Sequence, residues 1–413
     1  MSWSPGTMPE CVDAEQAGMS SQRLKNLNPY LQDYIDTERL AGCSVAVMRH
    51  GKLVFFENYG HARKEDATAM AADTIHRIYS MSKPITSVAL LTLYEKGKFQ
   101  LDDPLCWYLP EFKDMKVLTG GTAMQPITRP AQTQITIRHI TTHTAGLTYG
   151  FPGVPNAVDQ MYRRKLEGHF SEDLAAFCQK LATLPLRFDP GTGWNYSYAT
   201  DVQGRLIEVL SGMTFAEYLQ QAIFDPLGMV DTSFQVAPDK VSRFANNYHR
   251  NKGTLEVEDE HSESPYLQNR AFQSGGGGLT STLQDYLRFA LMMANKGELE
   301  GVRILGRKTV EYATMNHLPG GQDMEDMGAG GFAESAFRGV GFCLLGSTCI
   351  NPAISPSMQS LGDYGWGGAA GTRWWVDPSE SLTCVYMQQF MPGGLYPIQQ
   401  YLRSMVLQSI IDV

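Results

Sequence analysis

Ser80 and Lys83 are the residues whose types and spacing most directly suggest chemistry in this sequence. Three residues apart on a helix, their side chains would share one face, with Cβ atoms about 5–6 Å from each other. A serine hydroxyl is a poor nucleophile until a neighbouring group accepts its proton. A lysine can do this when burial lowers its pKa toward neutrality. The pair could equally be a helix N-cap beside a solvated lysine, because both residue types are common.

Two further segments carry residues suited to the same site. Tyr196 lies in a glycine-containing turn over residues 190–198, and a phenol with a reference pKa of about 10 can shuttle protons when a cation such as Lys83 lies near it. Residues 364–372 contain four glycines, which would let the backbone approach a substrate closely and direct an N–H group at a developing oxyanion. A loop over residues 142–147 resembles a structural motif more than a catalytic one.

The elements that must position these residues follow from the apolar pattern. It predicts an N-terminal helix over 24–35, a hairpin of 43–48 with 53–59, a second hairpin of 372–376 with 382–390, and a closing helix over 396–411. Between the hairpins it predicts helices over 80–96 and 201–210, a capping box that begins at Thr214, and long loops over 115–134 and 318–363.

Hairpins near both ends of a mostly helical chain predict an α+β fold. One antiparallel sheet would be built from the N- and C-terminal segments and flanked by helices, with a mostly helical lobe inserted into it. We therefore expect a single domain over residues 1–413, in which an α/β part covers roughly 1–80 plus 340–413 and a helical part covers roughly 81–339.

Composition narrows the classes of function. A chain of 413 residues that is 43% hydrophobic and 19% charged is typical of a globular enzyme, and it exceeds the roughly 250–300 residues of a single core. The net charge of −9, without a basic cluster, argues against a nucleic-acid partner. No apolar run of roughly 18 residues and no signal-like start are visible, so no membrane span is expected. Seven scattered cysteines without CxxC spacing favour reduced thiols and a cytoplasmic location.

The chain resembles the family VIII carboxylesterases, within the serine β-lactamase and penicillin-recognising superfamily. The matching segments are collinear and comprise SMSK from residue 80, LTLYEKGKFQLDDP from 91, TTHTAGL from 141, PGTGWNYSY from 190, IFDPLGMVDTSF from 223, SGGGGLTST from 274 and GWGGAAGT from 365. S-x-x-K is the nucleophile motif of class A β-lactamases and penicillin-binding proteins. The resemblance therefore implies a β-lactamase-like fold over most of the chain.

The resemblance also implies a role for individual residues. Ser80 would be the acylated nucleophile, Lys83 its activating partner and Tyr196 the general base. The backbone N–H groups of Ser80 and Ala369 would form the oxyanion hole, and the helix dipole at Ser80 would also favour negative charge. No metal and no organic cofactor are implied.

Two departures from the β-lactamase branch concern the substrate. That branch has Lys-Ser/Thr-Gly where this chain has Trp366, Gly367 and Gly368, so the charge that would hold a lactam's carboxylate is replaced by an indole. Tyr198 replaces the asparagine of a Tyr-x-Asn element, which would pair with a substrate amide. We expect these residues, together with Asp201, to bind a small-molecule ester with a short acyl chain. Asp201 could orient the site through a hydrogen bond, and a helix N-cap is an equally good interpretation of it.

Other functions stay open from the sequence. An acyltransferase would pass the acyl group to an alcohol, a β-lactamase or peptidase would use the same nucleophile (cephalosporins being a possible side activity), and an inactive relative would only bind ligands. His139 and His143 have the spacing of half a zinc site, but Ile140 stands where H-E-x-x-H needs glutamate. No G-x-S-x-G elbow is present, and glycines 275–278 predict a tight structural turn. The sequence does not determine the oligomeric state.

Overall fold

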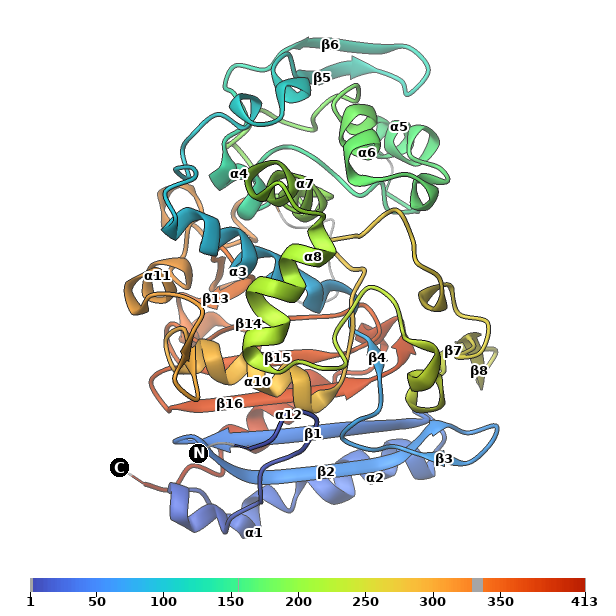
Figure 1. Cartoon of the computed structure of the whole chain (residues 1–413), viewed down its shortest axis with the longest axis vertical. Coiled ribbons are helices and arrows are strands. Elements are labelled where there is room, and N and C mark those ends of the chain that lie inside the picture. The colour runs from blue at the N-terminus through green and yellow to red at the C-terminus, as the bar shows by residue number, and fades with distance from the viewer. Residues whose placement is uncertain (1–2, 155, 329–336, 413) are drawn as a thin grey trace.

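An eight-stranded antiparallel sheet forms one end of the molecule (Figure 1) in a computed structural model that describes residues 3–154, 156–328 and 337–412. Its strands, in spatial order, are β12 (Val340–Phe342), β13 (Ser347–Cys349), β14 (Tyr364–Gly367), β15 (Arg373–Asp377), β16 (Leu382–Gln388), β1 (Gly42–Arg49), β2 (Lys52–Arg63) and β3 (Thr68–Ala69). The first and last parts of the chain therefore meet at the β1–β16 pair. The prediction of an α+β fold with a sheet built from both termini is confirmed.

Strand β1 is buried along its whole length because both faces of the sheet are covered. Successive side chains of a strand point to opposite faces. Val45 and Val47 belong to one apolar core with the N- and C-terminal helices. Ala46 and Met48 belong to a second core, which extends into the helical part of the chain. This two-sided burial explains why β1 reads as a continuous apolar run rather than an alternating one.

The helices surround the sheet and fill the other end of the molecule (Figure 1). They are α1 (Ser21–Leu24), α2 (Leu27–Asp36), α3 (Ser82–Glu95), α4 (Ile137–Thr141), α5 (Ala157–Lys165), α6 (Leu174–Leu181), α7 (Ala199–Ser211), α8 (Phe215–Leu219), α9 (Asp225–Leu227), α10 (Leu283–Ala294), α11 (Arg307–Ala313) and α12 (Ile398–Leu407). The predicted capping box at Thr214 is present at the start of α8. The predicted N-terminal helix is interrupted between α1 and α2. Within the described ranges, no helix has the length and apolar character needed to cross a membrane.

Two segments predicted as long loops contain strands instead. Residues 115–134 form an exposed hairpin of β5 (Lys116–Gly121) and β6 (Pro126–Pro130), and the polar, glycine-containing sequence gave no alternation to reveal it. Residues 318–363 contain the edge strand β12 and its neighbour β13, while residues 329–336 of that predicted loop lie outside the described part of the chain. The remaining short strands are β4 (His76–Arg77), β7 (Asn247–Asn251), β8 (Thr254–Asp259), β9 (Thr280–Ser281), β10 (Glu298–Leu299), β11 (Val302–Arg303) and β17 (Phe390–Met391).

Helix α3 and the β4–β9 pair position the segment that begins at Ser80. Every residue of α3 from Ser82 to Leu93 is buried, so packing holds the helix from all sides. Strand β4 ends three residues before Ser80, and it pairs with β9, which begins two residues after the glycines 275–278. This pairing brings two segments that are about 200 residues apart in sequence to the same place.

The predicted division into an α/β part and a helical part stays a prediction. One helix of the predicted helical part packs on the sheet. Helix α10 belongs to the predicted helical part, residues 81–339, but it packs on the sheet. The Tyr286 ring lies 5.8 Å from that of Trp374 on β15, and Phe289 lies 5.6 Å from the same indole. The sheet and the helical part therefore share one apolar core through α10.

Replacement of Trp374 by alanine tests this shared core. Trp374 is 1% exposed, so Trp374→Ala should leave a cavity and lower the free energy of unfolding by about 3–5 kcal/mol. Trp107→Ala is the matched control, because Trp107 is 68% exposed and should cost less than about 0.5 kcal/mol. Urea unfolding followed by far-UV circular dichroism measures both. Equal losses in the two variants would contradict the packing described here.

Candidate active site

Ser80 lies in a tight turn that leads directly into α3. Residues Tyr79–Met81 form one turn of 3-10 helix, and α3 begins at Ser82. Tyr79 has φ +42°, a conformation that non-glycine residues adopt rarely and at a cost in free energy. The turn is held from behind, since the Tyr286 hydroxyl donates a 2.9 Å hydrogen bond to the Met81 carbonyl. Strain of this kind often marks a functional site, and here it directs the Ser80 side chain into a large cavity.

Lys83 lies beneath the serine, and its ammonium group is almost fully removed from solvent. Its Nζ lies 3.2 Å from Ser80 Oγ and donates a 2.6 Å hydrogen bond to the carbonyl oxygen of Gly276. The side chain is 3% exposed. Burial lowers the pKa of Lys83 to about 7, and the nearby Asp201 carboxylate opposes part of this shift. At neutral pH a large fraction of this amine is therefore unprotonated and able to accept a proton.

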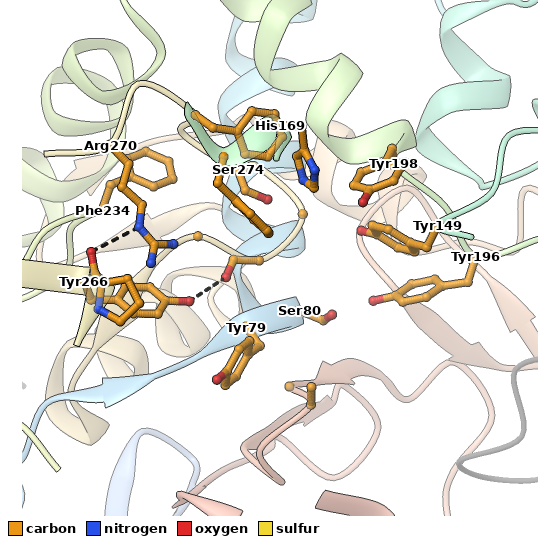
Figure 2. A pocket seen from close by; sticks show the side chains of 18 of the residues that line it. Tyr79, Ser80, Tyr149, His169, Tyr196, Tyr198, Phe234, Tyr266, Arg270 and Ser274 are labelled. Carbon is orange, nitrogen blue, oxygen red and sulfur yellow. Dashed lines mark hydrogen bonds between the residues drawn. The ribbon is translucent and has the colours of Figure 1, made fainter. Parts of the chain in front are cut away.

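Tyr196 lies on the other side of the same amine. Lys83 Nζ is 4.4 Å from the centroid of its ring, and Figure 2 shows the Tyr196 hydroxyl directed toward Ser80. The indole Nε1 of Trp366 on β14 donates a 3.1 Å hydrogen bond to this hydroxyl. Ser80, Lys83 and Tyr196, which the sequence predicted as a catalytic set, thus come together from two segments, the start of α3 and the turn before α7. Trp366 is 5% exposed and fixes the tyrosine as well as lining the cavity.

Aromatic rings surround Tyr196 and hold it in position. Tyr149 packs 5.3 Å from the Tyr196 ring and 4.5 Å from the Tyr198 ring, so the three tyrosines form a column beside Ser80 (Figure 2). His143 packs 4.9 Å from Tyr196 on another side. Burial, with a smaller contribution from the charge of Lys83, keeps the pKa of His143 well below its usual value. His143 is therefore a neutral packing partner, which agrees with the structural role expected for its loop.

Asp201 orients the site through hydrogen bonds, which is one of the two roles considered from the sequence. It is the third residue of α7, and Tyr198 occupies the N-cap position, so Asp201 is not an N-cap. It is fully buried and does not line the cavity, which gives no support to the predicted substrate contact. Its Oδ1 accepts hydrogen bonds from Ser274 Oγ at 2.5 Å and from the Gly276 N–H at 3.2 Å. Asp201 therefore orients the peptide whose carbonyl holds Lys83.

The turn after β14 brings the predicted oxyanion donors to one wall. Ser80, Gly367, Gly368 and Ala369 all line the cavity. A Cβ atom at Gly368 would lie 2.4 Å from the Ile78 carbonyl oxygen, so only glycine lets this turn approach the segment that carries Ser80. A Cβ atom at Gly367 would lie 2.9 Å from the Arg373 guanidinium, a flexible group that can shift. The pairing of the Ser80 and Ala369 N–H groups as an oxyanion hole stays a prediction that this proximity supports.

Three residues of the site were given no individual role by reasoning from the sequence. Tyr149 lies in a loop with no recognisable periodicity, and Ser274 and Gly276 lie in the stretch interpreted as a purely structural glycine turn. The only available signal was the position of that stretch within a family-like segment, SGGGGLTST. A Cβ atom at Gly276 would lie 2.6 Å from the Tyr149 hydroxyl and 2.8 Å from Asp201 Oδ2. A glycine is thus required here by space rather than by backbone conformation.

The two histidines with zinc-like spacing form hydrogen bonds within the protein. His139 Nδ1 accepts a hydrogen bond from the backbone of Thr136 in the capping box of α4, and His143 Nδ1 pairs with Ser197 Oγ at 3.1 Å. Over the ranges that the structure describes, no group of three or more His, Cys, Asp or Glu side chains could hold a metal ion.

Comparison with known proteins relates this geometry to a family. The β-lactamase family model matches residues 27–403. Esterase EstB of Burkholderia gladioli is 31% identical over 374 residues, which cover 86% of this chain and 88% of EstB. Acyltransferase calJ of Penicillium decumbens is 28% identical over 79% of this chain and 78% of its own. The structure of EstCE1, described as a hydrolase with promiscuous acyltransferase activity, superposes with a TM-score of 0.78 at 25% identity, covering 93% of this chain and 98% of EstCE1.

Covalent labelling tests the predicted nucleophile directly. A fluorophosphonate probe should label the wild-type protein, because Ser80 Oγ faces both the cavity and an amine that can accept its proton. Ser80→Ala should abolish labelling. Ser171→Ala is the matched control, since Ser171 also lines the cavity but its hydroxyl is bonded to the Gly168 carbonyl. Intact-mass spectrometry measures the adduct, and undiminished labelling of Ser80→Ala would rule out the assignment.

Proposed function

This chain belongs to the β-lactamase family, and we propose that it is a serine carboxylesterase that acts through an acyl-enzyme on Ser80. The observation that carries the proposal is the position of Lys83 Nζ, 3.2 Å from Ser80 Oγ and bonded to a backbone carbonyl in a buried site. A buried amine with a pKa of about 7 can take the serine proton at neutral pH. The EstB and EstCE1 resemblances support an ester as the substrate.

In the proposed mechanism Ser80 Oγ attacks the ester carbonyl while its one proton passes to the Lys83–Tyr196 pair, in which the Lys83 amine holds it and the phenol keeps its own proton. The developing oxyanion is stabilised by the backbone N–H groups of Ser80 and Ala369, and such a donor typically contributes about 10²–10³ in rate. The Tyr196 hydroxyl then protonates the departing alkoxide. Water, activated by the same two side chains, releases the acid and regenerates Ser80. Apart from the ester and water, every group in these steps belongs to the chain.

Trp366 supports an ester rather than a β-lactam as the main substrate. Its indole occupies the position where the resemblance would have a lysine to bind a carboxylate, and its N–H is bonded to Tyr196. The predicted preference for short acyl chains has less support. The cavity has a volume of about 1300 Å³, which is more than the roughly 300–1,000 Å³ of a typical small-molecule pocket. Trp366 therefore leaves room for more than a short acyl chain.

Acyl transfer to an alcohol is the second candidate function. It is favoured by the similarity to calJ and EstCE1 and by a cavity that could hold an acceptor beside the acyl-enzyme. Hydrolysis in the presence of a competing alcohol distinguishes the two. A product mixture that follows the molar ratio of water and alcohol indicates a hydrolase, whereas ester formation far above that ratio indicates a transferase.

We also propose a small-molecule partner and a cytoplasmic location. All seven cysteines are free, including the five buried ones, Cys43, Cys178, Cys343, Cys349 and Cys384. Free thiols in this number are typical of proteins from reducing compartments. Cell fractionation with an antibody against the protein tests the location.

A panel of esters and chromogenic cephalosporins tests the proposed function. Wild-type protein should hydrolyse esters with a higher kcat/KM than cephalosporins, and Ser80→Ala should lose both activities together with the acyl-enzyme seen by intact mass. Faster cephalosporin turnover would make β-lactam hydrolysis the primary activity. Equal activity in wild type and Ser80→Ala would exclude the mechanism altogether.

The acidic limb of the pH profile of kcat/KM should follow the deprotonation of Lys83. Because only the unprotonated amine accepts the serine proton, kcat/KM should rise with pH through about 7, the pKa that burial gives Lys83. Asp285, on α10, also has a pKa of about 7 through burial, but it lies outside the cavity lining. Asp285→Asn is therefore the control, and its limb should stay where it is in wild type. A limb near pH 9–10 would show that Lys83 is not desolvated during catalysis.

Asp201→Asn should move this limb to lower pH. The amide keeps an oxygen that can accept from Ser274 and Gly276, but it removes the negative charge that raises the pKa of Lys83. The Lys83 amine should then lose its proton at lower pH, so activity persists further into the acidic range. A purely structural role would lower kcat without shifting the limb, and a shift to higher pH would contradict the electrostatic argument.

A further inference from the structure

The cavity extends well beyond Ser80 on the side opposite Tyr196. Figure 2 shows Tyr196 on one side of Ser80 and Phe234, Tyr266 and Arg270 on the other. If Tyr196 protonates the departing alkoxide, as proposed above, the alcohol part of the ester lies on the Tyr196 side. The acyl chain must then extend toward the opposite wall, because the two substituents of the scissile carbonyl diverge. The inference below rests on that proposed function.

Arg270 is held in this wall with part of its guanidinium unused. Its Nε donates a 3.1 Å hydrogen bond to the Pro265 carbonyl, which fixes the plane of the group. Its Cζ lies 5.2 Å from the centroid of Tyr266 and 5.8 Å from that of Phe170. Among the residues that the structure describes, no carboxylate pairs with this guanidinium. Its two terminal nitrogens are therefore available to a ligand in the cavity.

Arg270 places a positive charge in the cavity of an acidic protein. The whole chain carries −9, and Asp259 is the one acidic side chain among the described residues of the lining. Asp259 is already paired with the buried Arg77 at 2.6 Å. His169 has its pKa lowered by burial and stays neutral. A cavity arginine that no described carboxylate pairs with favours an anionic ligand.

We propose that Arg270 binds a carboxylate at the far end of the substrate's acyl chain, so that half-esters of dicarboxylic acids are the preferred substrates. A guanidinium matches a carboxylate with two parallel hydrogen bonds. Aromatic side chains on the Arg270 side of the cavity, Phe234 and Tyr266 among them, supply an apolar surface for the methylene chain. The reaction is unchanged: half-ester and water give the dicarboxylate and the alcohol, and Arg270 neither gains nor loses a proton.

Matched pairs of p-nitrophenyl esters test this proposal. One member of each pair is a half-ester of succinic, glutaric, adipic or suberic acid, and the other carries a methyl ester in place of the free carboxylate. Wild-type protein should prefer the charged member at one chain length by about 10-fold or more in kcat/KM, as expected for a charge-assisted hydrogen bond. The preference should appear mainly in KM and should weaken in high salt.

Variants of Arg270 locate the effect. Arg270→Gln should lower kcat/KM for the preferred half-ester about 10- to 100-fold while leaving the neutral esters within about twofold. Arg270→Lys should retain part of the preference, since it keeps the charge but not the paired geometry. Arg250→Gln is the matched control, because Arg250 lies on β7 outside the cavity. Equal loss on charged and neutral esters in Arg270→Gln would overturn the proposal and indicate a structural role.

A binding measurement separates this inference from the proposed esterase activity. Adipate or its preferred homologue, titrated calorimetrically into Ser80→Ala, should bind when Arg270 is present and not in the Ser80→Ala, Arg270→Gln double variant. Arginine-dependent binding without hydrolysis of any ester would overturn the esterase proposal but leave the carboxylate site standing. Hydrolysis of neutral esters with no preference for half-esters, and no Arg270-dependent binding, would overturn the site and leave the esterase.

Discussion

The removal of the Lys83 ammonium group from water is the constraint on which the rest of the site depends. A charged amine in a poorly hydrated environment is unstable relative to its neutral form, and this instability makes Lys83 a base at neutral pH. The fold enforces it by burying α3 on every side and by closing Lys83 in with a backbone carbonyl and two tyrosine faces. A more open site would restore the ordinary basicity of the amine and leave Ser80 without a partner.

Asp201 limits how far burial lowers the pKa of Lys83. Without a nearby negative charge, burial would lower the pKa of Lys83 further and weaken the amine as a base. The Asp201 carboxylate, held by Ser274 and Gly276, offsets part of the desolvation. The carboxylate is itself buried, and burial raises its pKa, so the two groups titrate as a coupled system. Gly276 thus contacts both groups: its carbonyl accepts a hydrogen bond from Lys83, and its N–H donates one to Asp201.

Much of this arrangement was predictable from sequence, for identifiable reasons. Ser80 and Lys83 lie within one helical turn, so their proximity is local, and family-like segments pointed to Tyr196 and Trp366. The pairing of the terminal hairpins followed from apolar runs at both ends. Tyr149, Ser274 and Gly276 were not predicted because their roles arise only when distant segments pack together. The β5–β6 hairpin was missed because it is exposed and lacks the apolar alternation that marks a buried strand.

The pairing of β1 with β16 has a consequence for synthesis of the protein. On the ribosome, β1 and its hairpin partner β2 are made well before β16, the strand on the other side of β1, and before Trp366, two strands further along the sheet. Until β16 emerges, one edge of β1 is unpaired, and unpaired strand edges are prone to aggregation. Contacts this distant in sequence also form slowly. Chaperones are therefore expected to protect the nascent chain until β14, β15 and β16 have emerged, and the active site can form only after that point.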